Sequence, residues 1–249
     1  MIILKSPREI NLMKDANKIV AETHEYLTEK IKPGISTADI NKLADEFIRN
    51  ENAIPSFKDY QGFPAAVCVS INEEVVHGIP DERRILNSGD IVSIDIGTYY
   101  QGFNGDAART FAVGEVDNEV QRLLQVTEKS LMLGIEQAVK GNRLTDISNA
   151  VQKHVEGNGF SVVRDYVGHG IGRDMHEDPQ IPNFGPPGRG PILKKGMTFA
   201  IEPMVNIGSH EVETLDDGWT VVTKDKSFSA HFEHTIAIKD DEVEILSII

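Results

Sequence analysis

IVSIDIGTYYQGFNGDAARTFAV, residues 91–113, contains two apolar, strand-like runs on either side of a glycine-containing turn. Such runs bounded by glycine are typical of strands that pair as an antiparallel hairpin. We expect strands over residues 90–96 and 108–113, with the turn over 102–105. Asp95 interrupts the first run, and Asp106 follows it eleven residues later. Paired strands can place both carboxylates on one face of a sheet.

The chain before this hairpin predicts two helices and a further strand. Ser6-Pro7-Arg8-Glu9 is a capping box with proline in the first helical turn. Apolar residues follow at helical spacing, and the helix is expected to end near Pro33-Gly34. A second helix is expected to begin around residues 36–39, and a strand is expected over residues 66–71.

The second part of the chain repeats this order, with a long helix from Asp117 to Gly141, a shorter helix and further strand-like runs. His77-Gly78-Ile79 recurs as His169-Gly170-Ile171 at a spacing of 92, which is 15 residues shorter than the spacing of 107 between the other repeated residues. Loops of different length in the two halves can absorb this difference. Other pairs recur at a spacing of 107: Gly34 with Gly141, Asp39 with Asp146, Ile40 with Ile147, Gly89 with Gly196, and Asp95 with Glu202.

The repeat predicts one α+β domain over residues 1–249, built from two halves, about 1–116 and 117–249. We expect a pseudo-two-fold axis to relate the halves. Asp95 and Glu202 would then occupy matching positions in the two halves.

Five side chains in this framework suggest a metal site: Asp95, Asp106, His169, Glu202 and Glu233. Each lies in or beside an apolar, strand-like run, where an unpaired charge is costly. One aspartate beside a turn is more often a surface residue, but four carboxylates in such contexts favour a shared site. Oxygen ligands with one imidazole suit two divalent Mn, Fe, Co or Zn ions better than a structural zinc ion. Such ions activate water, so the predicted chemistry is hydrolysis of an amide or ester.

Composition and the remaining motifs exclude several other classes. The net charge of −14 without a basic stripe argues against specific nucleic-acid binding. Cys68 is the only cysteine, so an intramolecular disulfide and a thiolate-rich metal site are excluded. The absence of a signal core and of a membrane-length apolar run predicts a cytoplasmic protein without a membrane contact. No Ser-His-Asp set is recognisable, and the glycines around His169 lack the spacing of a phosphate loop.

Six motifs together resemble those of the type I methionine aminopeptidases. They are VHGIP at 76–80, SIDIG at 93–97, GD at 105–106, GHGIGR at 168–173, IEP at 201–203 and AHFEHT at 230–235. The resemblance covers essentially the whole chain. It implies the pita-bread fold, an antiparallel sheet covered by helices with internal pseudo-symmetry. It also implies a monomer that removes the initiator methionine from nascent polypeptides with a small second residue and associates transiently with the ribosome.

The resemblance also implies roles for individual residues. The five candidate ligands would bind two divalent ions, with Asp106 and Glu233 bridging them. Glu202 would in addition accept a proton from the attacking water, while His77 and His176 would contact the scissile amide and stabilise the tetrahedral intermediate. The methionine pocket would be lined by Phe57, Tyr60, Phe63, Cys68, Met175 and Trp219, and His77 and His176 would also contact the substrate. Many relatives carry phenylalanine in place of Met175 and tyrosine in place of Phe63, which leaves the pocket shape open.

Two alternatives share this fold. A proline-specific aminopeptidase or dipeptidase would usually carry an additional N-terminal domain and an arginine-containing motif in place of His231-Phe232-Glu233-His234. A catalytically silent pita-bread protein that only binds partners would typically lack the metal ligands, whereas all five candidates are present here.

Overall fold

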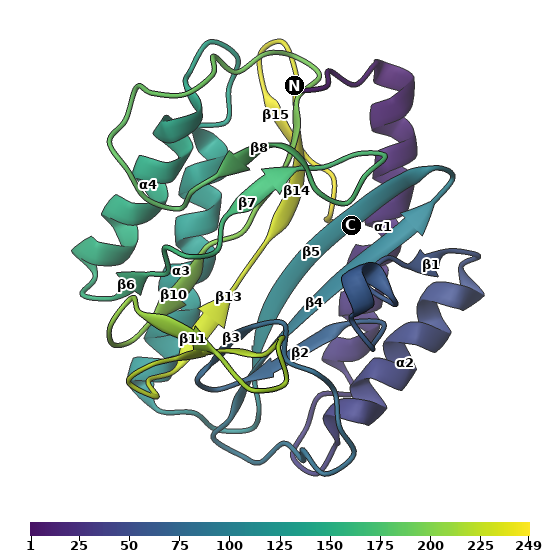
Figure 1. The fold of residues 1–249 in the computed structure, drawn as a ribbon, viewed down its shortest axis with the longest axis vertical. Coiled ribbons are helices and arrows are strands. Elements are labelled where there is room, and N and C mark those ends of the chain that lie inside the picture. The colour runs from purple at the N-terminus through teal and green to yellow at the C-terminus, as the bar shows by residue number, and fades with distance from the viewer.

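The fold combines four long helices with antiparallel strands (Figure 1). A computed structural model describes residues 1–249. The helices are α1 (Pro7–Thr28), α2 (Thr37–Asn50), α3 (Asn118–Glu136) and α4 (Leu144–Gly157). Helix α1 begins at the predicted capping box, in which the Ser6 and Glu9 side chains each accept a hydrogen bond from the other residue's N–H.

Helices α1 and α3 end earlier than the sequence pattern suggests, at Thr28 and Glu136 instead of near Gly34 and Gly141. The reason lies in contacts made by the glycines after the helices. The Gly34 N–H donates to the Leu86 carbonyl, and the Gly141 N–H donates to the Leu193 carbonyl. These bonds hold each chain segment against a later loop, so the helix cannot continue through it.

The strands form four sheets in which every pair is antiparallel. The first contains β1 (Ile54–Pro55), β2 (Cys68–Ile71), β4 (Ile91–Tyr100) and β5 (Phe103–Ala112). The second contains β6 (Ser161–Val162), β10 (Met204–Asn206) and β13 (Ser229–His231). The third contains β3 (Glu74–Val76), β11 (Val212–Thr214) and β12 (Val221–Thr223). The fourth contains β7 (Gly168–Gly170), β8 (Glu177–Ile181), β9 (Thr198–Ile201), β14 (His234–Ile238) and β15 (Val243–Ile245).

The predicted hairpin is strands β4 and β5, but its turn lies earlier than expected. Gln101 and Gly102 form the turn with φ angles of 49° and 89°, and residues 103–105 already belong to β5. Two consecutive positive φ angles match the twist of a tight two-residue hairpin. Asp95 pairs with Ala108, and Asp106 pairs with Gly97. Because positions two apart point to the same side of a strand, both carboxylates lie on one face, as predicted.

The two halves of the chain use matching hydrogen bonds. Ser36 bridges to Ile85 in the first half, and Arg143 bridges to Ile192 in the second, each residue 107 positions after its counterpart. Helices α1 and α2 lie on one side of Figure 1, and α3 and α4 lie on the other. These repeated contacts are the structural form of the pseudo-two-fold repeat seen in the sequence.

The two halves also correspond at a second spacing, which applies to β5, the partner of β4, and to β14, the partner of β9. The Gly89 N–H donates to Val113 O, and its counterpart Gly196 donates to Ile238 O, both at 2.9 Å. Val113 therefore corresponds to Ile238, at a spacing of 125. At this spacing the counterpart of Asp106 is His231, and the counterpart of Ala108 is Glu233.

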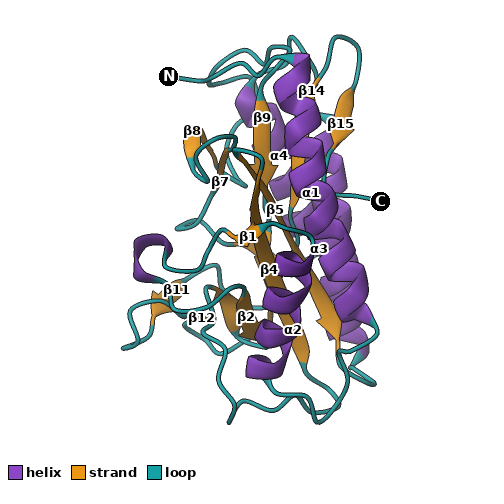
Figure 2. Cartoon of the chain, turned by 90° about the vertical axis from the view of Figure 1, so that its right-hand side faces the viewer, coloured by secondary structure: helices purple, strands orange, loops and turns teal.

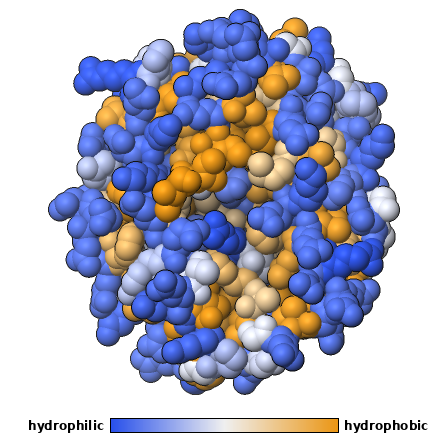
Figure 3. All heavy atoms as spheres, turned by 180° about the vertical axis from the view of Figure 1, so that it is seen from behind, coloured by the Kyte–Doolittle hydropathy of each residue, from blue (hydrophilic) through white to orange (hydrophobic).

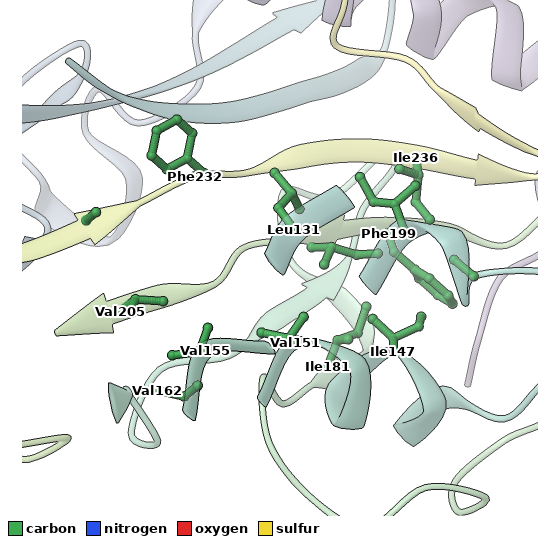
Figure 4. Packing of buried hydrophobic residues seen from close by; sticks show 14 of the residues in the cluster. Leu131, Ile147, Val151, Val155, Val162, Ile181, Phe199, Val205, Phe232 and Ile236 are labelled. Atoms are coloured by element: carbon green, nitrogen blue, oxygen red, sulfur yellow. The ribbon is translucent and has the colours of Figure 1, made fainter. Parts of the chain in front are cut away.

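The core lies between the helices and the sheets. Its largest part includes Leu131 of α3, Ile147 and Val151 of α4, and Phe199 of β9 (Figure 4). A second part packs α1 and α2 against β2 and β4. The helices lie together on one side of the strands, whereas the loops around β11 and the short helix η1 (Tyr60–Gly62) lie on the other (Figure 2).

The helix-covered face carries a band of hydrophobic residues between hydrophilic regions (Figure 3). No helix combines the length and apolar character needed to cross a membrane. Apolar residues of all four helices nevertheless pack into the core against the strands.

Candidate metal centre

The structure brings all five predicted metal ligands to one cavity of about 280 Å³. Asp95 and Asp106 come from the β4–β5 hairpin of the first half. The second half supplies His169 from β7, Glu202 directly after β9, and Glu233 between β13 and β14. The cavity therefore lies where the two halves of the chain meet.

His169 presents one ring nitrogen to the carboxylates. Its Nδ1 lies 2.9 Å from the carbonyl oxygen of Gly170, which requires the proton on Nδ1. Its Nε2 lies 3.8 Å from Asp106 Oδ2 and 3.6 Å from Glu202 Oε1. Burial lowers the pKa of His169 to about 3. The ring is therefore neutral, and a free lone pair on Nε2 faces the cavity.

Several carboxylate oxygens in the cavity lack any hydrogen-bond partner, although they are buried. They are Asp95 Oδ1, Asp106 Oδ1 and Glu233 Oε1. Burial and neighbouring negative charges raise the pKa values of Asp106, Glu202 and Glu233 well above their ordinary range. No lysine or arginine lines the cavity. Buried, unpaired carboxylates are strongly unfavourable, so a bound cation is the natural compensation.

The donor set fits divalent metal ions. One ligand atom each from Asp106, His169 and Glu233 lies within 4.8 Å of the others. Asp95 and Glu202 line the same cavity and supply further oxygens. Carboxylates combined with one imidazole suit Mn, Fe, Co or Zn in an open, catalytic site.

Glycines beside His169 permit close packing of strands. A Cβ atom on Gly168 would lie 2.4 Å from the Ala200 carbonyl oxygen, and one on Gly170 would lie 2.2 Å from the Asp178 carbonyl oxygen. The two glycines therefore let β7 approach its neighbouring segments, which fixes His169 over the cavity.

Most of the predicted substrate residues also line the cavity. They are Phe57, Tyr60, Phe63, Cys68, His77, His176 and Trp219. Phe63 and Trp219 make an edge-on aromatic contact with ring centroids 5.2 Å apart. Aromatic rings therefore form one wall, and the carboxylates form another.

Two residues differ from the sequence-based list. Met175 is buried but does not line the cavity, and it packs in a cluster with Phe57 and Tyr60 beside it. Gln61 does line the cavity, although an exposed glutamine in a loop carries no sequence signal that would have revealed it. Its φ of 50° belongs to the tight turn of η1, which directs this segment over the cavity.

The two additional histidines flank the metal ligands. The Tyr60 hydroxyl lies 2.8 Å from His176 Nδ1, and the rings of His176 and His169 are 4.3 Å apart. His77 follows β3 with a φ of 60°, and burial lowers its pKa to about 4. Both imidazoles thus stand beside the proposed metal site without contacting any cationic side chain.

Comparison with known proteins identifies the family. Residues 11–240 match the model of metallopeptidase family M24. The chain is 56% identical over 248 residues to a methionine aminopeptidase of Clostridium acetobutylicum, with 100% of this chain and 99% of the relative covered. This chain belongs to the M24 metallopeptidases.

Solved M24 structures confirm the pita-bread fold. The methionine aminopeptidase of Thermotoga maritima superposes with a TM-score of 0.99 at 49% identity, covering 100% of both chains. A prolidase of Pyrococcus furiosus has a TM-score of 0.81 at 20% identity, and this chain covers 66% of it. The likeness to the prolidase shows the shared M24 fold alone. The family is metal-dependent, which agrees with the carboxylate-rich cavity described above.

Proposed function

We propose that this chain removes N-terminal methionine from peptides and nascent polypeptides whose second residue is small. One observation carries the proposal: the cavity joins four carboxylates and an imidazole to an aromatic wall that includes Phe63 and Trp219. Thioether groups contact aromatic rings favourably, and an apolar pocket with a few polar groups selects one side chain. The relatives from Clostridium acetobutylicum and Thermotoga maritima are methionine aminopeptidases, which supports the same substrate here.

Two divalent ions, of Mn, Fe, Co or Zn, are the proposed cofactors. Asp95, Asp106, His169, Glu202 and Glu233 would hold these ions, because all five line the cavity and three of the carboxylates have an unpartnered buried oxygen. Such ions, when bound, lower the pKa of water and polarise a carbonyl group.

Glu202 is the proposed acceptor of the proton that the attacking water loses. Its carboxylate lines the cavity together with the other proposed ligands, and a carboxylate within hydrogen-bond reach of the attacking water can accept its proton. His77 and His176 would contact the scissile amide and its oxyanion. The Tyr60 hydroxyl can donate to His176 Nδ1, which leaves an N–H on Nε2 as a donor for this task.

The setting of this activity is also part of the proposal. Residues 1–249 would act as one catalytic domain, because residues from both halves line the cavity. We propose that the protein works as a monomer in the cytoplasm and associates transiently with ribosomes that carry nascent chains. Sedimentation of the purified protein with and without ribosomes tests both the monomer and the association.

Peptide cleavage tests the activity. The metal-reconstituted protein should release methionine from Met-Gly-Met and should not cleave an Xaa-Pro peptide at a comparable rate. His169→Ala and Glu202→Gln each remove a proposed metal ligand, so they should abolish turnover while retaining a folded circular dichroism spectrum. Rapid Xaa-Pro turnover without methionine release would overturn the assignment. Activity of either variant within a few-fold of the parent would exclude the metal-site model.

A further inference from the structure

His231 is a buried imidazole beside the metal centre that the proposed mechanism does not use. It is the last residue of β13, and its side chain is 2% exposed. Its Nε2 has no hydrogen-bond partner. Buried polar atoms normally have partners, so an unpartnered ring nitrogen requires an explanation.

The backbone of His231 is fixed on both sides by one residue. The His231 N–H donates to the Thr110 hydroxyl oxygen at 2.9 Å, and the same hydroxyl donates to the His231 carbonyl oxygen at 2.8 Å. Thr110 belongs to β5, four residues after Asp106. The backbone of His231 is therefore held in register with the hairpin that carries two of the proposed metal ligands.

The free nitrogen of His231 faces Glu202. Its Nε2 lies 3.7 Å from Glu202 Oε2, while His169 Nε2 lies 3.6 Å from Glu202 Oε1. The carboxylate of Glu202 thus has one imidazole beside each oxygen. His169 belongs to the closest cluster of proposed ligands, with Asp106 and Glu233, so Oε1 is directed toward that cluster and Oε2 toward His231.

The pseudo-symmetry explains why His231 reaches this position. It is the counterpart of Asp106 at the spacing of 125 described above, so the fold directs both side chains toward the seam between the halves. A carboxylate at this position binds a cation. An imidazole N–H at the matching position can instead donate to a carboxylate.

We propose that His231 is a positioning residue that closes the 3.7 Å separation when the site is loaded, donates its Nε2–H to Glu202 Oε2 and thereby leaves Oε1 for the metal. The inference rests on the proposed metal-dependent function and deepens it. A donor on the outer oxygen of a ligating carboxylate fixes its orientation, and loss of such a donor typically costs 10–100-fold in metal affinity or activity.

Three substitutions in the full chain test this role: His231→Gln, His231→Asn and His231→Leu. Glutamine carries an amide N–H at a similar reach, asparagine is too short, and leucine has no donor. The measurements are cobalt(II) affinity and stoichiometry by calorimetry, the visible spectrum of bound cobalt, and kcat and KM on Met-Gly-Met.

We expect His231→Gln to retain the parent spectrum and a kcat within a few-fold. His231→Asn and His231→Leu should bind cobalt about 10–100-fold more weakly, with a changed spectrum and a lower kcat. The number of cobalt ions bound at saturation should equal that of the parent, and KM should change less than kcat. The asparagine variant supplies the result if the leucine variant does not fold.

His154→Leu is the control. It makes the same change from imidazole to leucine in α4, and His154 does not line the cavity. It should retain the cobalt spectrum, the cobalt affinity and the kcat of the parent.

Two results would overturn the role of His231. Parent-like cobalt binding by both His231→Asn and His231→Leu would show that the donor is not needed. Loss of one bound cobalt in His231→Gln would make His231 a metal ligand instead. A parent protein that binds cobalt but releases no methionine would contradict the proposed function alone, and a parent that binds no cobalt would contradict both.

Discussion

The hydroxyl of Thr235 donates a hydrogen bond to the main-chain carbonyl oxygen of Asp106 at 2.8 Å. Thr110 makes the matching bond to the carbonyl oxygen of His231, also at 2.8 Å. Thr235 follows Thr110 by 125 positions, as His231 follows Asp106, so the two bonds are pseudo-symmetric copies of one contact. They join β5 to the segment around β14 at the point where both halves supply metal ligands.

Thr235→Val should weaken this junction, because valine keeps the shape of threonine but removes the donor. We expect a loss of about 1–3 kcal/mol in the free energy of unfolding and weaker cobalt binding, since Asp106 loses a backbone support. Urea denaturation and cobalt calorimetry measure the two effects. Thr127→Val is the control, since its buried hydroxyl bonds to Leu123 O within α3. An equal loss of cobalt affinity in the control would contradict a specific effect at the junction.

Asp106→Asn should stabilise the metal-free protein at neutral pH. Burial and neighbouring carboxylates raise the folded-state pKa of Asp106 well above its ordinary value. Folding therefore favours the protonated acid, so its contribution is fully present below about pH 4 and is lost as pH rises through the raised pKa. With a metal chelator, the variant should exceed the parent by about 1–3 kcal/mol at pH 8, and the difference should vanish near pH 3.5.

The same substitution should have the opposite effect in saturating cobalt, because the variant has lost a ligand. Urea denaturation of both proteins with chelator and with cobalt, across pH 3.5–8, measures the reversal. A metal-free variant that is less stable than the parent at pH 8 would contradict the view that the carboxylates repel one another.

Tyr60→Phe should lower kcat on Met-Gly-Met about tenfold without affecting the fold. The Tyr60 hydroxyl lies 2.8 Å from His176 Nδ1, and its loss frees the imidazole to change tautomer and orientation. Steady-state kinetics and the ¹⁵N shifts of His176 report the two consequences. Tyr99→Phe, an exposed tyrosine outside the cavity, should be neutral. Unchanged ¹⁵N shifts in Tyr60→Phe would show that the hydroxyl does not set the tautomer.

Gly97→Ala should disturb the methionine pocket and leave the metal site intact. A Cβ atom on Gly97 would lie 2.7 Å from Phe57 Cε1 and 2.8 Å from Met175 Cε, so one side chain must move. We expect a several-fold higher KM with parent-like cobalt affinity. The double variant Gly97→Ala with Met175→Ala should recover KM, because the smaller residue leaves space behind Phe57. No recovery would mean that the strain lies in the backbone of β4.

The sequence predicted the proposed metal ligands better than the side chains that surround them in the cavity. Asp95 and Asp106 could be assigned to one face of a hairpin, because strand alternation is a local rule. The location of Met175 behind Phe57 could not be predicted, because it depends on which loop packs over Gly97. Gln61 had no signal for the same reason, since its place at the cavity follows from the turn of η1.

By itself, the sequence determined the helices, the main hairpin, the repeat at a spacing of 107 and the five candidate ligands. These features depend on periodicity, caps and motifs that neighbouring residues encode. The tertiary structure alone decided the second spacing of 125, which makes His231 the counterpart of Asp106. It also placed Glu202 between His169 and His231. Contacts between halves arise only when packing has fixed the loop paths, and no local pattern records that outcome.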